Sequence, residues 1–302
     1  MTMKRLSWYP PMPVLILAAF VRFGATQGVR AGDVSAPQQL ASALWQPGVH
    51  HVAPLAGQAA TNHAVLLAQL RHVPKTAGFE SRTFSMGTGT SAESLRYLLF
   101  RPATNSARGP LPLVLSLHGG GPRHDFAHLL EPEAPGFAYG LGRLVCEETQ
   151  REHPCWVVVP WSHQRGWDAA NQRLVLGLLA ALQREFSVDA KRLYVTGQSM
   201  GGSGTWSMIT EHPEVFAAAV PICGAGDPAR AVRAKSVAIW ALHGSGDALV
   251  PVEGTRGMIA PLLAAGAKPV YWEYDHATHA ETAERAYCEP ELIRWLFAQH
   301  RP

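Results

Sequence analysis

From about residue 79 onward, the chain alternates short apolar strands with segments of helical periodicity, and this alternation limits the possible folds more than any other feature. Runs such as 111–117 and 156–160 are largely apolar, whereas 174–186 places its leucines at helical spacing. Strands that are apolar on both faces are typical of parallel sheets covered by helices on both sides. We therefore expect an α/β fold with a mostly parallel central sheet and helices on both faces.

The expected elements follow one another without an internal repeat. The first two strands, joined by a Gly/Thr/Ser-rich turn, are predicted to form a hairpin. The strands are expected at 79–84, 95–101, 111–117, 156–160, 192–196, 216–222, 237–242 and 269–274. The helices are expected at 174–186, 199–210, 259–265 and 292–299, with a shorter one near 66–70.

One of these strands runs into Gly197-Gln198-Ser199-Met200-Gly201, directly before a helical segment. This G-x-S-x-G spacing is that of a nucleophile elbow, which holds a serine on a tight turn between a strand and a helix. The residues two positions away must lack bulk, and the helix directs its first amides and the positive end of its dipole at the same point. A plain strand-to-helix turn also needs small residues, so this motif alone leaves both interpretations open.

Two later strand ends carry residues that would make Ser199 a nucleophile. Ligands bind beyond the carboxyl ends of the strands in such sheets, so catalytic side chains are expected in the turns that follow strands. Asp247 and His279 follow two later strands, in the order Ser, Asp, His that is typical of α/β-hydrolases. We predict that Asp247 orients His279 and that His279 is the base. His276 is the alternative base, and Asp275 is the weaker alternative acid.

An oxyanion hole is predicted after the strand 111–117, where the chain continues as His118-Gly119-Gly120-Gly121. Glycines let backbone N–H groups approach a substrate oxygen closely. The amides of Gly120 or Gly121, together with that of Met200, are predicted to stabilise a tetrahedral intermediate.

Three further side chains are candidates for substrate contact. Gln198 precedes the predicted nucleophile, and Trp161 and Trp167 follow the strand 156–160. For the two tryptophans, packing in the core or on the surface is the alternative interpretation.

Four segments together resemble the peptidase/esterase group of α/β-hydrolases, which is related to polyhydroxybutyrate depolymerases and feruloyl esterases. They are LPLVLSLHGGGPR, RLYVTGQSMGGSGTWSMITEHPEVFAAAVPICGAGDP, VAIWALHGSGDALVPVEGTRGMI and YWEYDHATHAETAERAY. The resemblance covers about residues 78–300 and implies Ser199 as nucleophile, Asp247 as acid and His279 as base. The tryptophan that this family often places shortly after the histidine is absent here, so the resemblance does not define the substrate pocket.

These residues predict a serine hydrolase that cleaves a small-molecule or polymeric carboxylic ester through an acyl-enzyme, without a metal or an organic cofactor. A serine peptidase of the prolyl-oligopeptidase type is the main alternative, because ester and amide hydrolysis use overlapping machinery. The other alternative is a non-catalytic binding protein on a hydrolase scaffold, against which a complete triad argues. The sequence does not predict the oligomeric state.

Charge and composition exclude other classes of function. The net charge is only +3 and the basic residues are scattered, which argues against a nucleic-acid partner. The 14 histidines include no HExxH motif and the four cysteines include no CxxC pair, so no metal site is predicted.

The N-terminal region has the outline of a signal peptide over residues 1–31. Lys4 and Arg5 precede the apolar run 14–21, which is too short to span a bilayer, and small residues follow. We therefore expect export to the periplasm or the exterior and no stable membrane insertion, with a cytoplasmic protein as the alternative. Residues 32–77 are predicted to be a partly ordered extension and residues 78–302 the catalytic domain.

The four cysteines, at positions 146, 155, 223 and 288, are an even number, which suits an exported protein with one or two disulfides. Cys146 and Cys155 are close enough in sequence to close a small loop. Four buried thiols are the alternative interpretation.

Overall fold

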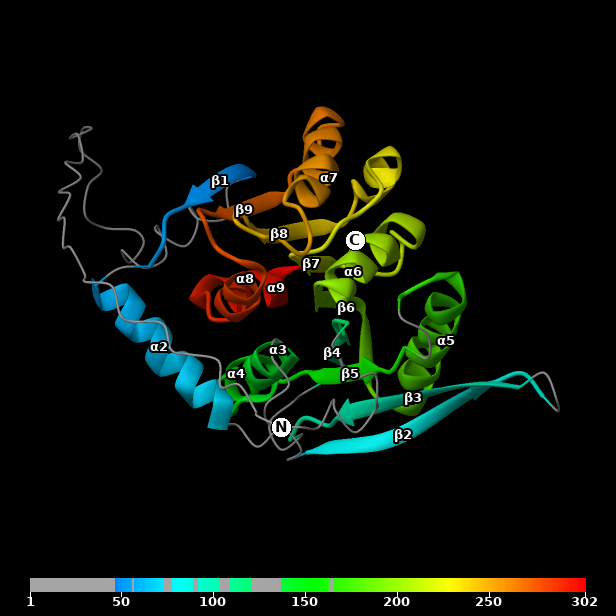
Figure 1. Ribbon diagram of the computed structural model, residues 1–302. Helices are drawn as coiled ribbons and strands as arrows, with labels where there is room; N and C mark the ends of the chain where they lie inside the picture. Colours follow the sequence, from blue (N-terminus) through cyan, green and yellow to red (C-terminus); the bar gives the residue numbers. More distant parts are fainter. Residues whose placement is uncertain are drawn as a thin grey trace, which may run out of the picture.

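The computed structural model describes residues 47–55, 57–72, 78–88, 92–103, 109–120, 137–162 and 166–302. These residues form a nine-stranded sheet with helices on both faces (Figure 1). The expected signal peptide, residues 1–31, and the predicted oxyanion residue Gly121 lie outside the described residues.

The strand order across the sheet is β1-β9-β8-β7-β6-β4-β5-β3-β2. From β1 to β5 in this order all neighbours are parallel, while β3 is antiparallel to both β5 and β2. The mostly parallel sheet and the first hairpin are therefore confirmed. The strands are β1 (Gly48–Val52), β2 (Phe79–Met86), β3 (Glu93–Phe100), β4 (Leu111–Leu117), β5 (Trp156–Pro160), β6 (Val188–Gln198), β7 (Ala218–Ile222), β8 (Ala238–Gly244) and β9 (Val270–Tyr274).

The helices form a layer on each face of the sheet (Figure 1). One face is covered by α5 (Ala169–Glu185), α6 (Met200–Glu211), α7 (Glu253–Ala264) and the 3₁₀-helix η4 (Pro228–Ala234). The other is covered by α3 (Phe137–Val145), α4 (Glu147–Glu152), α8 (His279–Ala286) and α9 (Pro290–Ala298), and α2 (Gly57–His72) contacts α3. None of the helices in the described ranges combines the length and the apolar character that crossing a membrane requires.

The core consists of two buried clusters, one under each helical layer. Consecutive residues of one strand belong to different clusters, because side chains alternate across a sheet. Leu115 and Val195 pack in the cluster with α5 and α6, whereas their neighbours Val114 and Tyr194 pack in the cluster with α3 and α9. This explains why the central strands carry apolar residues on both faces.

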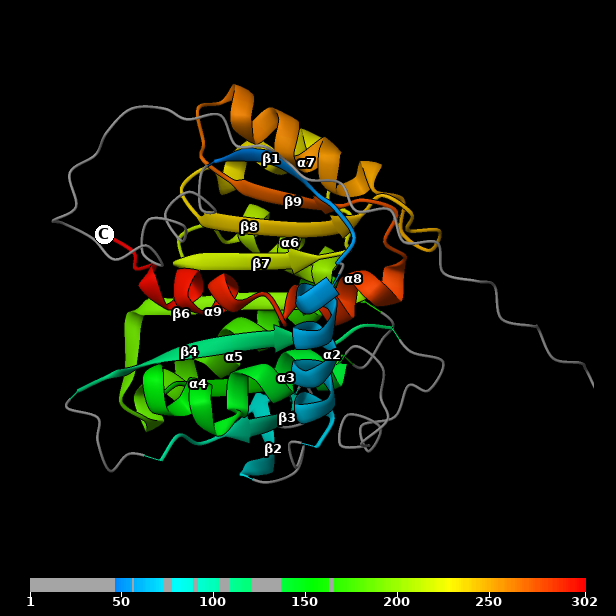
Figure 2. The same ribbon diagram turned by 90° about the vertical axis from the view of Figure 1, so that its left-hand side faces the viewer.

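The parallel strands point in one direction and so end on the same side of the sheet (Figure 2). Each of β6, β8 and β9 is followed at this edge by one of the predicted catalytic residues. The topology therefore concentrates side chains that lie far apart in the sequence.

Several elements differ from the sequence-based expectation. Strands β4 and β5 have the predicted bounds, but β6 begins at Val188, where it pairs with Leu111 ahead of a register shift. The expected short helix at 66–70 lies within the longer α2. Residues 32–77 also supply β1, which adds a parallel edge strand beside β9. The sequence GVHHV has no clear strand pattern, and β1 forms through pairing with β9, more than 200 residues away in the chain.

All four cysteines lie in the described residues, and all are free thiols. Cys155, Cys223 and Cys288 are buried, and Cys146 is half-buried. The expectation of one or two disulfides, with Cys146 and Cys155 as a possible pair, is therefore wrong, and the alternative of buried thiols holds for three of the four cysteines. The Cys146 thiol instead donates to the Arg143 carbonyl oxygen at 3.3 Å.

Candidate active site

Ser199 occupies a strained turn between β6 and α6. Its φ of 56° and ψ of −120° lie outside the regions that residues with a side chain usually adopt. Such a conformation costs on the order of 1–3 kcal/mol and persists only where the surrounding structure enforces it. Two hydrogen bonds of 2.9 Å do so here, because the Ser199 amide donates to the Ile222 carbonyl and the Ser203 amide donates to the Ser199 carbonyl. This is the backbone form expected of a nucleophile elbow.

The flanking glycines are required by close backbone packing. A Cβ atom on Gly197 would lie 2.5 Å from the Gly201 carbonyl oxygen, and one on Gly201 would overlap the Leu117 carbonyl oxygen. Any side chain at either position would therefore push the elbow away from the end of β4.

The loop after β4 lies directly against this elbow. A Cβ atom on Gly119 would be 3.6 Å from Ser199 Cβ, and one on Gly120 would be 3.5 Å from Met200 Sδ. The structure thus brings together Gly120 and Met200, two of the residues whose amides are predicted to form an oxyanion hole.

Trp161 and Trp167 both pack on His118, at the start of this loop. The Trp161 ring stacks on the imidazole with centroids 4.6 Å apart, and Trp167 meets it edge-on at 5.1 Å. The Ser162 amide donates to His118 Nε2 at 3.1 Å, so His118 Nδ1 carries the ring proton and donates to the Gly119 carbonyl at 2.9 Å. The two tryptophans therefore support the loop, and their contact with a substrate stays a prediction.

Gln198 is buried next to the same loop, with its Cγ 3.8 Å from where a Gly119 Cβ would lie. Among the described residues, its Oε1 atom has no hydrogen-bond partner. Its contact with substrate also stays a prediction.

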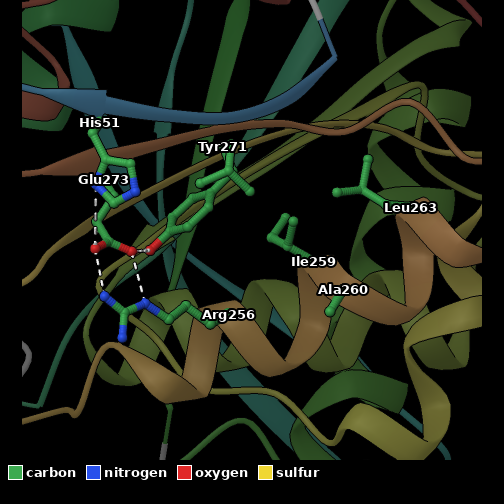
Figure 3. A pocket seen from close by; sticks show the side chains of 8 residues that line it. His51, Arg256, Ile259, Ala260, Leu263, Tyr271 and Glu273 are labelled. Atoms are coloured by element: carbon green, nitrogen blue, oxygen red, sulfur yellow. Dashed lines mark hydrogen bonds and ion pairs between the residues drawn. The ribbon is translucent and has the colours of Figure 1, made fainter.

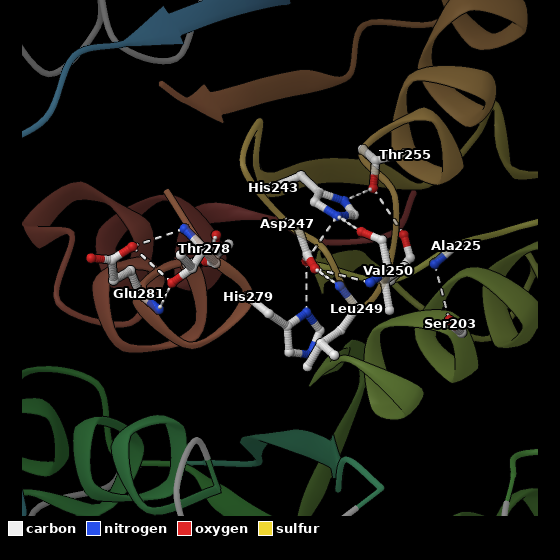
Figure 4. Close-up of polar contacts among 12 residues, drawn as sticks. Ser203, Ala225, His243, Asp247, Leu249, Val250, Thr255, Thr278, His279 and Glu281 are labelled. Carbon is white, nitrogen blue, oxygen red and sulfur yellow. Dashed lines mark hydrogen bonds and ion pairs between the residues drawn. The ribbon is translucent and has the colours of Figure 1, made fainter. Parts of the chain in front are cut away.

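Asp247 and His279 form a short hydrogen bond at the carboxyl edge of the sheet (Figure 4). His279 Nδ1 lies 2.6 Å from Asp247 Oδ2, while Asp247 Oδ1 accepts the Leu249 and Val250 amides at 2.9 Å each. Burial raises the pKa of Asp247, but hydrogen bonds from Val250, His279 and Leu249 outweigh it and hold the pKa below its usual value. Asp247 is therefore ionised at neutral pH and can accept a hydrogen bond from the imidazole N–H.

The alternatives His276 and Asp275 are placed differently. The backbone amide of His276 donates to Ser245 Oγ at 2.8 Å, and the Asp275 carboxylate lies 3.5 Å from the His51 ring. We expected His279 in a loop, but it is the first residue of α8. A capping box between Thr278 and Glu281 starts that helix and fixes the position of His279.

His243 was not predicted as part of this site, yet it is the second histidine that contacts Asp247. Its Nε2 atom lies 3.0 Å from the Val250 carbonyl oxygen and 3.3 Å from Asp247 Oδ2, and its Nδ1 atom lies 2.8 Å from Thr255 Oγ1. Because Nε2 faces two acceptors, it carries a ring proton. Burial lowers the pKa of this fully buried histidine, so it is neutral at pH 7. The only signal in the sequence was its position four residues before Asp247.

We expect His243 to make folding stability fall as the solution becomes acidic. Its pKa is lowered in the folded chain and is about 6.5 when unfolded. Below about pH 6.5 the unfolded chain therefore binds more protons, and the free energy of unfolding decreases by up to about 1.4 kcal/mol per pH unit until the folded pKa is reached. Urea unfolding at two pH values on either side of 6.5 measures this. The free energy of unfolding should change less between the two pH values in His243→Gln than in the wild type. In His276→Gln, which alters an exposed histidine, it should change as much as in the wild type. If the free energy of unfolding of His243→Gln depends on pH as strongly as that of the wild type, His243 is not the cause of the acid sensitivity.

Cys223 is a further residue that was not predicted to belong to the site. It is fully buried at the end of β7, with a positive φ of 39°, and its thiol lies beside the backbone of Ser199. Its Sγ atom lies within 4.8 Å of a carboxylate oxygen of Asp247 and a ring nitrogen of His279. Burial raises the pKa of this thiol to about 12, so Cys223 is protonated and does not compete as a nucleophile.

A separate cavity of about 320 Å³ lies between β9 and α7 (Figure 3). Its walls are mostly apolar, and one side carries Glu273, which accepts two hydrogen bonds from Arg256 at 2.6 and 2.9 Å. None of the predicted site residues lines it, so we place the candidate active site at the elbow. The lining residues are Val49, His51, Arg256, Ile259, Ala260, Leu263, Tyr271 and Glu273.

Comparison with known families matches only part of the chain. A model described as the prolyl oligopeptidase family matches residues 164–241. This range contains Ser199 and its flanking glycines but ends before Asp247 and His279. None of the curated proteins matches the chain in sequence.

Solved structures match a larger part. A thermostable esterase is 31% identical with a TM-score of 0.63, over 74% of this chain and 64% of that one. A ferulic acid esterase is 16% identical with a TM-score of 0.53, over 72% of this chain and 99% of that one. An acylaminoacyl peptidase from Pyrococcus horikoshii is 14% identical with a TM-score of 0.54, over 74% of this chain and 42% of that one. The last two likenesses concern the fold alone, and the chain spans less than two thirds of the thermostable esterase.

Proposed function

We propose that the chain is an α/β-hydrolase of the peptidase/esterase group and that it hydrolyses carboxylic esters by acyl transfer to Ser199, on the basis of its likeness to the prolyl oligopeptidase family model and to a thermostable esterase. The observation that carries the proposal is the 2.6 Å hydrogen bond between His279 and Asp247, at the same sheet edge as the strained Ser199 turn. The likeness to a thermostable esterase favours esters as the substrate class.

The position of Cys223 indicates that Ser199 lies near Asp247 and His279. Its thiol contacts the Ser199 backbone and lies within 4.8 Å of both the Asp247 carboxylate and the His279 ring. The serine and the histidine thus border the same buried thiol.

In the proposed mechanism, the Asp247 carboxylate holds the proton of His279 on Nδ1 and leaves the Nε2 lone pair free. Nε2 accepts the Ser199 proton while Oγ attacks the ester carbonyl carbon. The backbone amides of Met200 and of Gly120 or Gly121 stabilise the oxyanion. His279 then protonates the departing alcohol, which leaves an acyl-serine.

The second half of the reaction repeats these steps with water. His279 accepts a proton from a water molecule, which attacks the acyl carbonyl, and then returns the proton to Ser199 as the acid departs. Each step uses only groups of this chain, the substrate and water.

Peptide hydrolysis is the second candidate, because the matched family model is that of the prolyl oligopeptidases. A panel of p-nitrophenyl esters, feruloyl sugars, a polyester and peptides separates the two. We expect turnover of esters and none of peptides. Turnover of peptides alone would assign a peptidase, and no turnover by a folded protein would favour the non-catalytic alternative.

A further inference from the structure

We propose that Cys223, Asp247 and His279 form a binding site for a soft divalent cation such as Zn²⁺, and that its occupancy inhibits the enzyme. Binding itself depends only on the three side chains. The inhibitory effect rests on the proposed function, in which Asp247 and His279 act with Ser199.

The spacing of the three side chains is close to that of a zinc site. One potential ligand atom from each lies within 4.8 Å of the other two. Tetrahedral zinc, with bonds of about 2.0–2.3 Å, holds its ligand atoms roughly 3.3–3.6 Å apart. The 2.6 Å separation of His279 Nδ1 and Asp247 Oδ2 would have to widen by under about 1 Å, and the sulfur would have to approach by up to about 1.3 Å. Side-chain rotations are sufficient for changes of this size.

The backbone keeps the Cys223 thiol at this point. The Cys223 amide donates to the Leu242 carbonyl at 2.9 Å, and the backbone of Cys223 has a positive φ of 39°. Acyl transfer as proposed makes no use of this thiol, so a sulfur ligand is present beside the catalytic pair without a part in the reaction.

Charge and ligand type select the cation. One thiolate, one carboxylate and one neutral imidazole balance a dication, so the occupied site carries no net charge that burial would penalise. Thiolate and imidazole ligands favour Zn²⁺ or Cd²⁺, whereas Mg²⁺ and Ca²⁺ prefer oxygen ligands. Binding would release the thiol proton to solvent.

A bound cation would remove the base of the proposed mechanism. If Nδ1 of His279 binds the cation, the ring proton moves to Nε2, and if Nε2 binds it, that lone pair is occupied. In both cases His279 has no lone pair left for the Ser199 proton. The side chains of Cys223 and Asp247 are fully buried, while that of His279 is 16% exposed, so the cation must enter past His279. We therefore expect inhibition with a slow onset.

Titration with Co²⁺ tests the binding directly, without any measurement of activity. We expect one Co²⁺ per chain and thiolate-to-cobalt charge-transfer absorption in the wild type and in Ser199→Ala. Zn²⁺ should abolish that absorption by displacement. Cys223→Ser should lack the absorption, while Cys146→Ser, which removes the most exposed of the four thiols, should retain it. Absence of the absorption in the wild type, or its loss in Cys146→Ser alone, would overturn the proposal.

Inhibition is tested with Zn²⁺ on ester hydrolysis. The wild type should lose activity slowly and regain it with a chelator, and Mg²⁺ should have no effect. With each protein compared with its own rate in the absence of metal, Cys223→Ala should need at least about tenfold more Zn²⁺ for half-inhibition than the wild type, since loss even of a group that only supports a metal ligand typically costs about 10- to 100-fold in affinity. Equal sensitivity of Cys223→Ala and the wild type would overturn the proposal. A chain that binds Co²⁺ through sulfur but hydrolyses no ester would instead refute the proposed function.

Discussion

Replacement of Ser199 by alanine should reduce kcat for ester hydrolysis on the order of 10⁶-fold, because no covalent route remains once the nucleophile is lost. The oxyanion hole and substrate binding should leave a small residual rate above that of water. Initial rates with a p-nitrophenyl ester measure the loss. A fluorophosphonate probe provides a second measurement, since it should add its mass to the wild type and not to the variant.

Ser203→Ala is the matched control for this experiment. Ser203 lies on α6, one turn after Ser199, and its Oγ accepts the Ala225 amide at 2.9 Å (Figure 4). We expect this variant to keep its activity and its reaction with the probe. Wild-type activity in Ser199→Ala would refute the proposed nucleophile.

Asp247→Asn should lower kcat by about 10⁴-fold, which is typical when the acid of a triad becomes an amide. The contacts of Asp247 explain why the loss is expected to be large. Oδ1 accepts two backbone amides, so the oxygen of an asparagine must take that position and its NH₂ group must face His279. His279 would then accept on Nδ1 and carry its proton on Nε2, and it could not accept the Ser199 proton.

Asp275→Asn is the control, because Asp275 is the alternative acid in the sequence and lies beside the exposed His51. It should leave kcat within about twofold of the wild type, as is usual for a change away from the reacting groups. A large loss in Asp275→Asn together with a small one in Asp247→Asn would reverse the assignment of the acid. Thermal unfolding of both variants separates loss of catalysis from loss of fold.

Local features of the sequence were sufficient to predict most of the sheet. β4 and β5 are largely apolar because both of their faces are buried, and that property is visible in the sequence alone. The elbow was also predictable, since backbone packing excludes side chains at Gly197 and Gly201. The export of the chain and the role of residues 32–77 remain predictions.

Elements that form through distant contacts were missed or misjudged. β1 depends on pairing with β9. The short polar α8 was missed for another reason, because its capping box of Thr278 and Glu281 is a local signal that the sequence-based prediction did not use. The expectation of disulfides failed because an even number of cysteines says nothing of how far apart their sulfur atoms lie. Spacing motifs also say nothing of the proposed cation site, because Cys223, Asp247 and His279 approach one another only through the order of the strands.

The sequence by itself determined the alternation of strands and helices, the glycine-flanked turn at Ser199 and the order of the candidate triad, because each depends on residues that are neighbours in the chain. Only the tertiary structure decided that Asp247 pairs with His279 and not with His276, that His243 shares the same carboxylate and that Cys223 borders the site. Those contacts join the ends of β7, β8 and β9, and the parallel pairing of these strands brings their ends to one edge of the sheet.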